Sequence, residues 1–206
     1  MVVAAVLPGC SPAGEGDGHP AAASAMSEPA SSAPAEPGPP AQPHRVRGVR
    51  DDARLILTCG LPGAGKTTLA MQIAAERSAV RLTKDEWLRA LGSSPWDTRA
   101  NEKVEQELWR LAQEILSHGL SVVLDFGLWA RTERDEKRAV ARRIGVAVEL
   151  HYLDVPPDEL WRRIEERNSA PPWQKEPISR ADLDEWVGVF EAPDARELAL
   201  FDPPPR

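Results

Sequence analysis

The stretch RLILTCGLPGAGKTTLA, from Arg54 to Ala70, decides the fold of this 206-residue chain. It begins with a short apolar run that is typical of a buried strand and then enters a glycine-rich turn ending in Lys-Thr-Thr. Residues 60–67 match the full P-loop pattern Gly-x-x-x-x-Gly-Lys-Thr, which stands here after an expected strand and before an expected helix. The sequence therefore predicts a loop that holds the phosphate chain of a nucleotide.

Each part of this loop has a chemical task. The glycines let backbone N–H groups curl around the β-phosphate, and the N-terminus of the following helix adds its dipole. Lys66 is expected to reach the β- and γ-phosphate oxygens, and the hydroxyl of Thr67 is expected to bind Mg²⁺. We therefore expect ATP and Mg²⁺ as cofactors. The expected nucleotide-binding residues are Gly60, Pro62, Gly63, Ala64, Gly65, Lys66, Thr67 and Thr68.

Short apolar runs alternate with amphipathic stretches in the rest of the chain. Val104, Leu108, Leu111 and Ile115 step by four and three, which predicts a helix with one apolar stripe that ends near residues 118–119. Alternating strands and helices predict parallel βαβ units. We expect an α/β P-loop NTPase fold, a three-layer sandwich with a mostly parallel sheet and a helical lid. The expected strands are LILTC (55–59), AVRLT (79–83), SVVLDF (121–126) and VAVELHYL (146–153).

Composition divides the chain into two parts. Residues 1–50 are mainly Ala, Pro, Ser and Gly, a composition that predicts a disordered tail because it offers little apolar surface to bury. Residues 51–206 are expected to form a single kinase domain with a formal charge of -6, since the tail accounts for -1 of the total of -7. The chain contains no apolar run of about 18 residues, so no membrane span is expected. Two cysteines, read as free thiols, favour a cytoplasmic location.

Asp85 follows the second expected strand, about twenty residues after Lys66. Ligands of such sheets gather at the carboxyl ends of the strands, so a carboxylate there can accept the proton of an attacking hydroxyl. The simpler alternative is that Asp85 caps the helix expected over residues 86–91. We favour the catalytic base, in contact with substrate.

The third expected strand ends in Val-Leu-Asp-Phe-Gly, which places Asp125 where a carboxylate can hold Mg²⁺ or contact substrate. The alternative is a carboxylate bonded to neighbouring backbone. Beyond it, Arg134 lies in the first turn of a charged helix, close enough to the sheet edge to be a candidate substrate contact. The alternative is an arginine on a solvated, charged helix face.

Arg163 and Arg167 lie four residues apart on the expected helix 158–168, just before a loop rich in Pro, Trp and Ser. Such a loop has the composition of a lid, and arginines beside it can close over the phosphates and stabilise charge during transfer. The alternative is that both form surface ion pairs with glutamates one turn away. We favour the catalytic assignment.

Four segments, GLPGAGKTT, RLTKDEW, VVLDFGLW and LDVPPDELWRRIEERN, resemble the small P-loop kinases that are labelled as ATP-binding or AAA-like proteins. That group is similar to chloramphenicol phosphotransferase, the zeta toxins, gluconate kinase and the 5'-hydroxyl polynucleotide kinase domain. The resemblance covers about residues 53–202. It implies phosphoryl transfer from ATP to a hydroxyl, with Lys66 and Thr67 at the nucleotide, Asp85 as base and Arg163 or Arg167 in the lid.

One departure from that pattern bears on the acceptor. Polynucleotide kinases tend to carry an Arg three residues after the base, where this chain has Leu88, and Arg89 follows one residue later. An acidic domain also favours a small-molecule acceptor, such as an antibiotic, sugar or nucleoside, over nucleic acid. Two alternatives stay open: a 5'-hydroxyl polynucleotide kinase, and a nucleotide-binding regulator without efficient transfer. The sequence does not identify the acceptor.

Overall fold

The computed structural model describes residues 52–94, 97–169 and 177–205. The tail expected over residues 1–50 and most of the loop expected to act as a lid lie outside these residues. Within them the elements follow in this order: β1 (Arg54–Cys59), α1 (Lys66–Arg77), β2 (Val80–Thr83), α2 (Lys84–Ala90), α3 (Thr98–Ser117), β3 (Val122–Gly127), α4 (Arg131–Ile144), β4 (Ala147–Tyr152), α5 (Pro157–Ser169), α6 (Arg180–Val189) and α7 (Ala195–Leu198).

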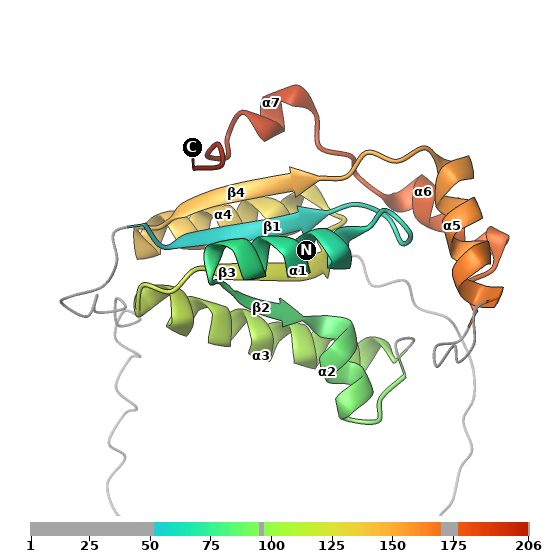
Figure 1. Ribbon diagram of the computed structural model, residues 1–206, viewed down its shortest axis with the longest axis horizontal. Coiled ribbons are helices and arrows are strands. Elements are labelled where there is room, and N and C mark those ends of the chain that lie inside the picture. Colours follow the sequence, from blue (N-terminus) through green and yellow to red (C-terminus); the bar gives the residue numbers. More distant parts are fainter. Residues whose placement is uncertain (1–51, 95–96, 170–176, 206) are drawn as a thin grey trace, which may run out of the picture. The chain divides into compact units, whose positions relative to one another are not determined.

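The four strands of the described residues form one parallel sheet in the order β2-β3-β1-β4. All four lie within one or two residues of the segments expected from the sequence. Because the strands run in the same direction, their carboxyl ends meet at one edge (Figure 1), where the loops after β1, β2 and β3 begin. The expected α/β P-loop NTPase architecture is confirmed.

Helices cover both faces of the sheet, which gives three layers (Figure 1). On one face, Ile56 of β1 and Val123 of β3 pack against Ala70 and Ile73 of α1. On the other face, alternate strand residues pack against α3 and α4. This larger cluster includes Leu55, Leu57, Leu124, Leu108, Ala112 and Val140.

Helix α3 carries the apolar stripe that the sequence predicts. Leu108 is buried, and Val104, Leu111 and Ile115 pack against the core beside it. Asp97 caps the helix by accepting a hydrogen bond from the backbone of Ala100, and the helix ends at Ser117, where the sequence indicates its end.

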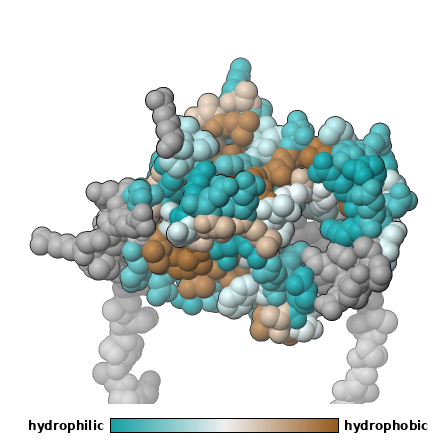
Figure 2. All heavy atoms as spheres, viewed as in Figure 1, coloured by the Kyte–Doolittle hydropathy of each residue, from teal (hydrophilic) through white to brown (hydrophobic). Residues whose placement is uncertain are grey.

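A third apolar cluster joins helices α5 and α6 to the P-loop. Leu160 and Ile164 of α5 and Leu183 of α6 are buried against Leu61 and Ala64 of the loop. Helix α5 is therefore fixed beside the phosphate-binding turn. Hydrophilic residues cover most of the face seen in Figure 2. Among the described residues, the helices are all too short or too polar to cross a membrane.

Candidate active site

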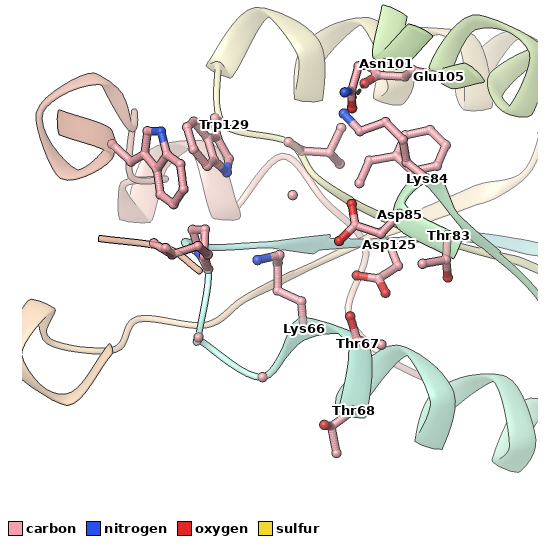
Figure 3. A pocket seen from close by; sticks show the side chains of 18 of the residues that line it. Lys66, Thr67, Thr68, Thr83, Lys84, Asp85, Asn101, Glu105, Asp125 and Trp129 are labelled. Carbon is pink, nitrogen blue, oxygen red and sulfur yellow. Dashed lines mark hydrogen bonds and ion pairs between the residues drawn. The ribbon is translucent and has the colours of Figure 1, made fainter. Parts of the chain in front are cut away.

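A cavity of about 720 Å³ lies at the carboxyl edge of the sheet, between the P-loop, the start of α2, the end of β3 and helix α5 (Figure 3). Residues that the sequence places far apart line it together. Besides residues of the P-loop backbone, they include the side chains that were expected to act in catalysis or metal binding: Lys66, Thr67, Asp85, Asp125, Arg163 and Arg167.

The P-loop takes the backbone course that its glycines allow. Gly60, Gly63 and Gly65 have φ angles of 146°, 85° and 96°, in a region that other residues rarely adopt. Gly63 also lies against α5, since a Cβ atom there would stand 3.1 Å from the carbonyl oxygen of Leu160. Pro62, Gly63, Gly65, Lys66, Thr67 and Thr68 border the cavity, whereas Gly60 and Ala64 are not among its lining residues.

Lys66 opens helix α1 and points into the cavity (Figure 3). Its Nζ donates a hydrogen bond to the carbonyl of Leu61 at 2.9 Å. Burial lowers the pKa of Lys66, and the nearby carboxylates of Asp125 and Asp85 oppose that shift. A poorly solvated ammonium of this kind favours an anionic ligand, because a phosphate restores the interactions that water no longer supplies.

Asp125 lies at the end of β3, and its side chain is 3 % exposed. Its Oδ1 accepts a weak hydrogen bond from Thr58 at 3.5 Å. Its Oδ2 makes no hydrogen bond to any described residue, although Nη1 of Arg81 stands 3.6 Å away. Burial raises the pKa of Asp125, while a hydrogen bond from Thr67 and the charge of Lys66 lower it.

These residues suit a magnesium ion. Mg²⁺ prefers oxygen ligands and is usually held by one or two carboxylates together with substrate phosphates. The buried Oδ2 of Asp125 and the hydroxyl of Thr67, which Figure 3 shows side by side at the cavity, are such oxygens. Thr67 and Asp125 are thus the residues that would hold the ion.

Asp85 stands on the opposite side of Lys66 from the P-loop backbone, with its carboxylate directed into the cavity (Figure 3). Thr83 occupies the N-cap position of α2, and Asp85 is the second residue of the helix. The capping alternative therefore does not describe Asp85. Burial lowers the pKa of Arg167, and the charge of Asp85 opposes that shift, so the two side chains are electrostatic neighbours.

Arg163 and Arg167 of α5 both border the cavity. Arg163 makes the ion pair with Glu159 that a surface arginine would make, with 2.7 Å between Nε and Oε1. Its Nη1 also reaches the carbonyls of Gly63 and Ala64 at 3.4 and 3.5 Å, so it lies over the P-loop. Arg167 is half-buried at the cavity, near Asp85.

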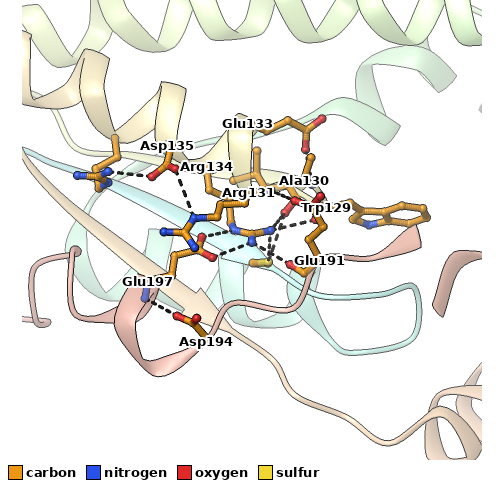
Figure 4. Close-up of polar contacts among 12 residues, drawn as sticks. Trp129, Ala130, Arg131, Glu133, Arg134, Asp135, Glu191, Asp194 and Glu197 are labelled. Carbon is orange, nitrogen blue, oxygen red and sulfur yellow. Dashed lines mark hydrogen bonds and ion pairs between the residues drawn. The ribbon is translucent and has the colours of Figure 1, made fainter. Parts of the chain in front are cut away.

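The structure places Arg134 away from the expected substrate contact (Figure 4). Its side chain is fully buried and forms a bidentate ion pair with Glu197. Nε donates to Oε1 at 2.6 Å, and Nη2 donates to Oε2 at 3.0 Å. Its remaining donors bind the carbonyls of Leu128, Trp129 and Glu191. Because these partners engage its guanidinium, we assign Arg134 a structural role in place of substrate binding.

Other residues line the cavity without having been assigned from the sequence. Nζ of Lys84 and Oε2 of Glu105 form an ion pair at 3.0 Å. Trp129 and Trp186 meet with their ring centroids 5.7 Å apart. Lys84 adjoins Asp85 in the sequence, but Glu105 and Trp186 come from α3 and α6, and only the packing of those helices brings them to the site.

A family model described as an AAA domain (AAA_33) matches residues 55–193. The chain belongs to this AAA domain family. The match begins at β1 and includes every cavity residue discussed above. Among curated proteins, none matches the chain.

Solved structures share the fold at low identity. One chain of the Pnkp1/Rnl/Hen1 RNA repair complex aligns with a TM-score of 0.60 and 18% identity over 76% of this chain and 48% of its own length. This chain thus spans about half of that protein. A candidate kinase from Chloroflexus aurantiacus aligns with a TM-score of 0.56 and 23% identity, over 70% of this chain and 83% of the kinase chain. Chaetomium thermophilum Kti12, solved with ADP-AlF3, aligns with a TM-score of 0.55 and 19% identity. That alignment covers 69% of this chain and 82% of the Kti12 chain.

Proposed function

We propose that this AAA-family protein is a cytoplasmic, Mg²⁺-dependent phosphotransferase that moves the γ-phosphate of ATP to a hydroxyl of a small molecule. One observation carries the proposal: a P-loop lysine and two carboxylates from different strand ends, Asp85 and Asp125, border one cavity. A nucleotide-binding protein needs the loop, whereas a carboxylate placed across the cavity from Lys66 is what transfer to a hydroxyl requires.

In the proposed reaction, the acceptor oxygen attacks the γ-phosphorus while Asp85 takes the hydroxyl proton. The bond between the γ-phosphorus and the bridging oxygen then breaks, and ADP leaves with that bond's electron pair. Lys66, Arg163 and Arg167 stabilise the negative charge on the phosphoryl oxygens. Mg²⁺ bound by Thr67 and Asp125 would supply further positive charge at the β- and γ-phosphates.

The likeness to a chain of an RNA repair complex favours a second candidate, a 5'-hydroxyl polynucleotide kinase. Against it, position 88 is a fully buried leucine, so this position offers no cation to an oligonucleotide phosphate. The formal charge of -7 gives a polyanion no general attraction either.

An ADP-release screen tests both candidates. The full chain is incubated with ATP, Mg²⁺ and, in separate wells, sugars, nucleosides, aminoglycoside and phenicol antibiotics, or a 5'-hydroxyl oligonucleotide, and product masses are checked for one added phosphoryl group. We expect a small alcohol to be phosphorylated, with an apparent affinity that changes little with salt. Lys66→Ala should abolish the product, and Arg162→Ala, an exposed change on α5, should not.

Transfer to the oligonucleotide, with affinity falling by roughly 0.7 log units per log unit of salt for each phosphate contact, would establish the second candidate instead. A panel that is inert although the chain binds Mg·ATP would contradict both and favour a regulatory nucleotide-binding protein.

A further inference from the structure

The turn at the end of β3, residues 127–129, has an unusual backbone at the edge of the cavity. Gly127 and Leu128 have φ angles of 93° and 48°, so two successive residues adopt the left-handed region. Leucine rarely does so, because its Cβ atom crowds the backbone. Such a conformation persists only where surrounding contacts hold it, and it is common at functional sites.

Arg134 supplies these contacts from helix α4 (Figure 4). Its Nη1 donates to the carbonyl oxygens of both Leu128, at 2.9 Å, and Trp129, at 3.0 Å. The Sγ of Cys59 donates to the same Leu128 oxygen at 3.4 Å, from the end of β1. The carbonyls of the turn are thereby fixed from two elements of the core.

The C-terminal segment holds the arginine in place. Glu197 of α7 is 2 % exposed and binds the Arg134 fork through both carboxylate oxygens. Glu191 binds the turn as well, since its backbone N–H donates to the carbonyl of Trp129 at 3.2 Å and its carboxylate accepts from the N–H of Arg131 at 2.6 Å. A segment about sixty residues later in the chain therefore encloses the turn.

This turn also places Trp129 next to the P-loop. A Cβ atom at Gly127 would stand 3.2 Å from Nε1 of Trp129 and 3.8 Å from Cε of Lys66, so Gly127 lies close to both the indole and the lysine. The N–H of Gly60 also approaches the carbonyl of Gly127, at 3.4 Å. A shift of this turn would move the indole and the lysine relative to each other.

We propose that Arg134 and Glu197 are positioning residues, which hold the strained 127–129 turn so that Trp129 forms a fixed wall of the cavity beside Lys66. The relevance of this wall to phosphoryl transfer rests on the proposed function, whereas the positioning rests on the contacts alone. Arg134 acts on the site through the turn and not by touching substrate.

Fluorine NMR of the full chain labelled with 5-fluorotryptophan tests the proposal. Trp129→Phe identifies the Trp129 resonance, and the resonance of Trp109, buried in α3, reports whether the fold is intact. In Glu197→Gln and Arg134→Lys we expect the Trp129 resonance to shift or broaden while that of Trp109 stays unchanged. In the wild type, Mg²⁺ with the ATP analogue AMPPNP should shift the Trp129 resonance, and this response should be lost in both variants.

Arg142→Gln is the matched control, because it removes a contact between the same helix and the same C-terminal segment, the 2.7 Å ion pair with Asp202, at a site away from the turn. It should leave Trp129 unchanged. If a single variant fails to fold, Arg134→Gln with Glu197→Gln leaves no unpaired buried charge and repeats the test.

A Trp129 resonance that is the same in all variants, or that changes as much in Arg142→Gln, would overturn the positioning role. A wild-type Trp129 resonance that ignores the analogue while the analogue binds would overturn the placement beside the phosphate site. Failure of the analogue to bind would contradict the proposed function instead, and the comparison without nucleotide would still decide the positioning role.

Discussion

Two features of the P-loop favour glycine at position 63: a positive φ angle and close contact with helix α5. Replacing Gly63 by alanine, together with a control replacement, separates the two effects. Gly63 has a φ of 85°, and a Cβ atom there would stand 3.1 Å from the carbonyl oxygen of Leu160 and 3.2 Å from Cγ1 of Ile164. Gly145, the residue that caps α4, has nearly the same φ of 84°, with nothing within 4 Å of the added atom. Gly145→Ala is therefore a control for the backbone term alone.

The expected costs follow from these surroundings. A left-handed conformation costs a non-glycine residue about 1–2 kcal/mol, which is the whole effect expected for Gly145→Ala. Gly63→Ala adds overpacking against Leu160 and Ile164, the buried residues of α5, which costs about 1–3 kcal/mol, so its total should be about 2–5 kcal/mol. The added methyl group should also push α5 away from the P-loop. Because α5 carries Arg163 and Arg167, this displacement should weaken Mg·ATP binding, whereas Gly145→Ala should leave it unchanged.

Urea unfolding of both variants measures the free energies, provided that the slopes match that of the wild type. Titration with Mg·AMPPNP measures the affinities. A Gly63→Ala protein that is no less stable than Gly145→Ala, and that binds the analogue normally, would refute the close approach between the P-loop and α5.

Three further changes test individual side chains. Asp85→Asn should slow transfer about 10²–10⁴-fold with nearly unchanged ATP affinity, as measured by kcat and by nucleotide titration; an equal loss of affinity would contradict the base assignment. Arg167→Ala should slow transfer about 10²–10³-fold, whereas exposed Arg162→Ala should not. Asp125→Asn should raise Tm without Mg²⁺ at neutral pH and remove the stabilisation by Mg·ATP. Since burial raises the pKa of Asp125, its ionisation costs stability as pH rises past its ordinary value of about 3.9, so the gain in Tm should vanish in acid.

Local patterns were sufficient to predict the sheet and the phosphate loop. Buried parallel strands are continuous apolar runs, so residues 55–59 and 121–126 can be recognised as strands from the sequence. The glycines of the loop mark positions where the backbone can adopt a positive φ. Asp85 and Asp125 could be expected at one edge because Asp85 comes two residues after β2 and Asp125 lies near the carboxyl end of β3. Topology alone brings such residues together.

The partners of Arg134 could not be predicted in the same way. A charged side chain in an arginine-rich helix is usually solvated, and the sequence pattern does not reveal that this one is fully buried. Its partner Glu197 lies 63 residues away in a four-residue helix. Such a pair is set by how the C-terminal segment packs on the β3–α4 turn, which no short-range periodicity encodes.

The charges of the cavity connect its stability with its chemistry. Burial lowers the pKa of Lys66 and raises that of Asp125, so each residue is held where its charged form is poorly solvated. The two charges only partly compensate each other, because the pKa of each still departs from its ordinary value in the direction that burial dictates. A triphosphate would supply anionic oxygens to Lys66, and Mg²⁺ would supply a cation to Asp125, so Mg·ATP would relieve both costs at once. Ligand binding of this kind stabilises the folded state by mass action. Lys66 and Asp125 thus lower the stability of the protein without nucleotide, and nucleotide binding depends on the same two groups. Asp125→Asn should therefore make the protein more stable and weaken its function.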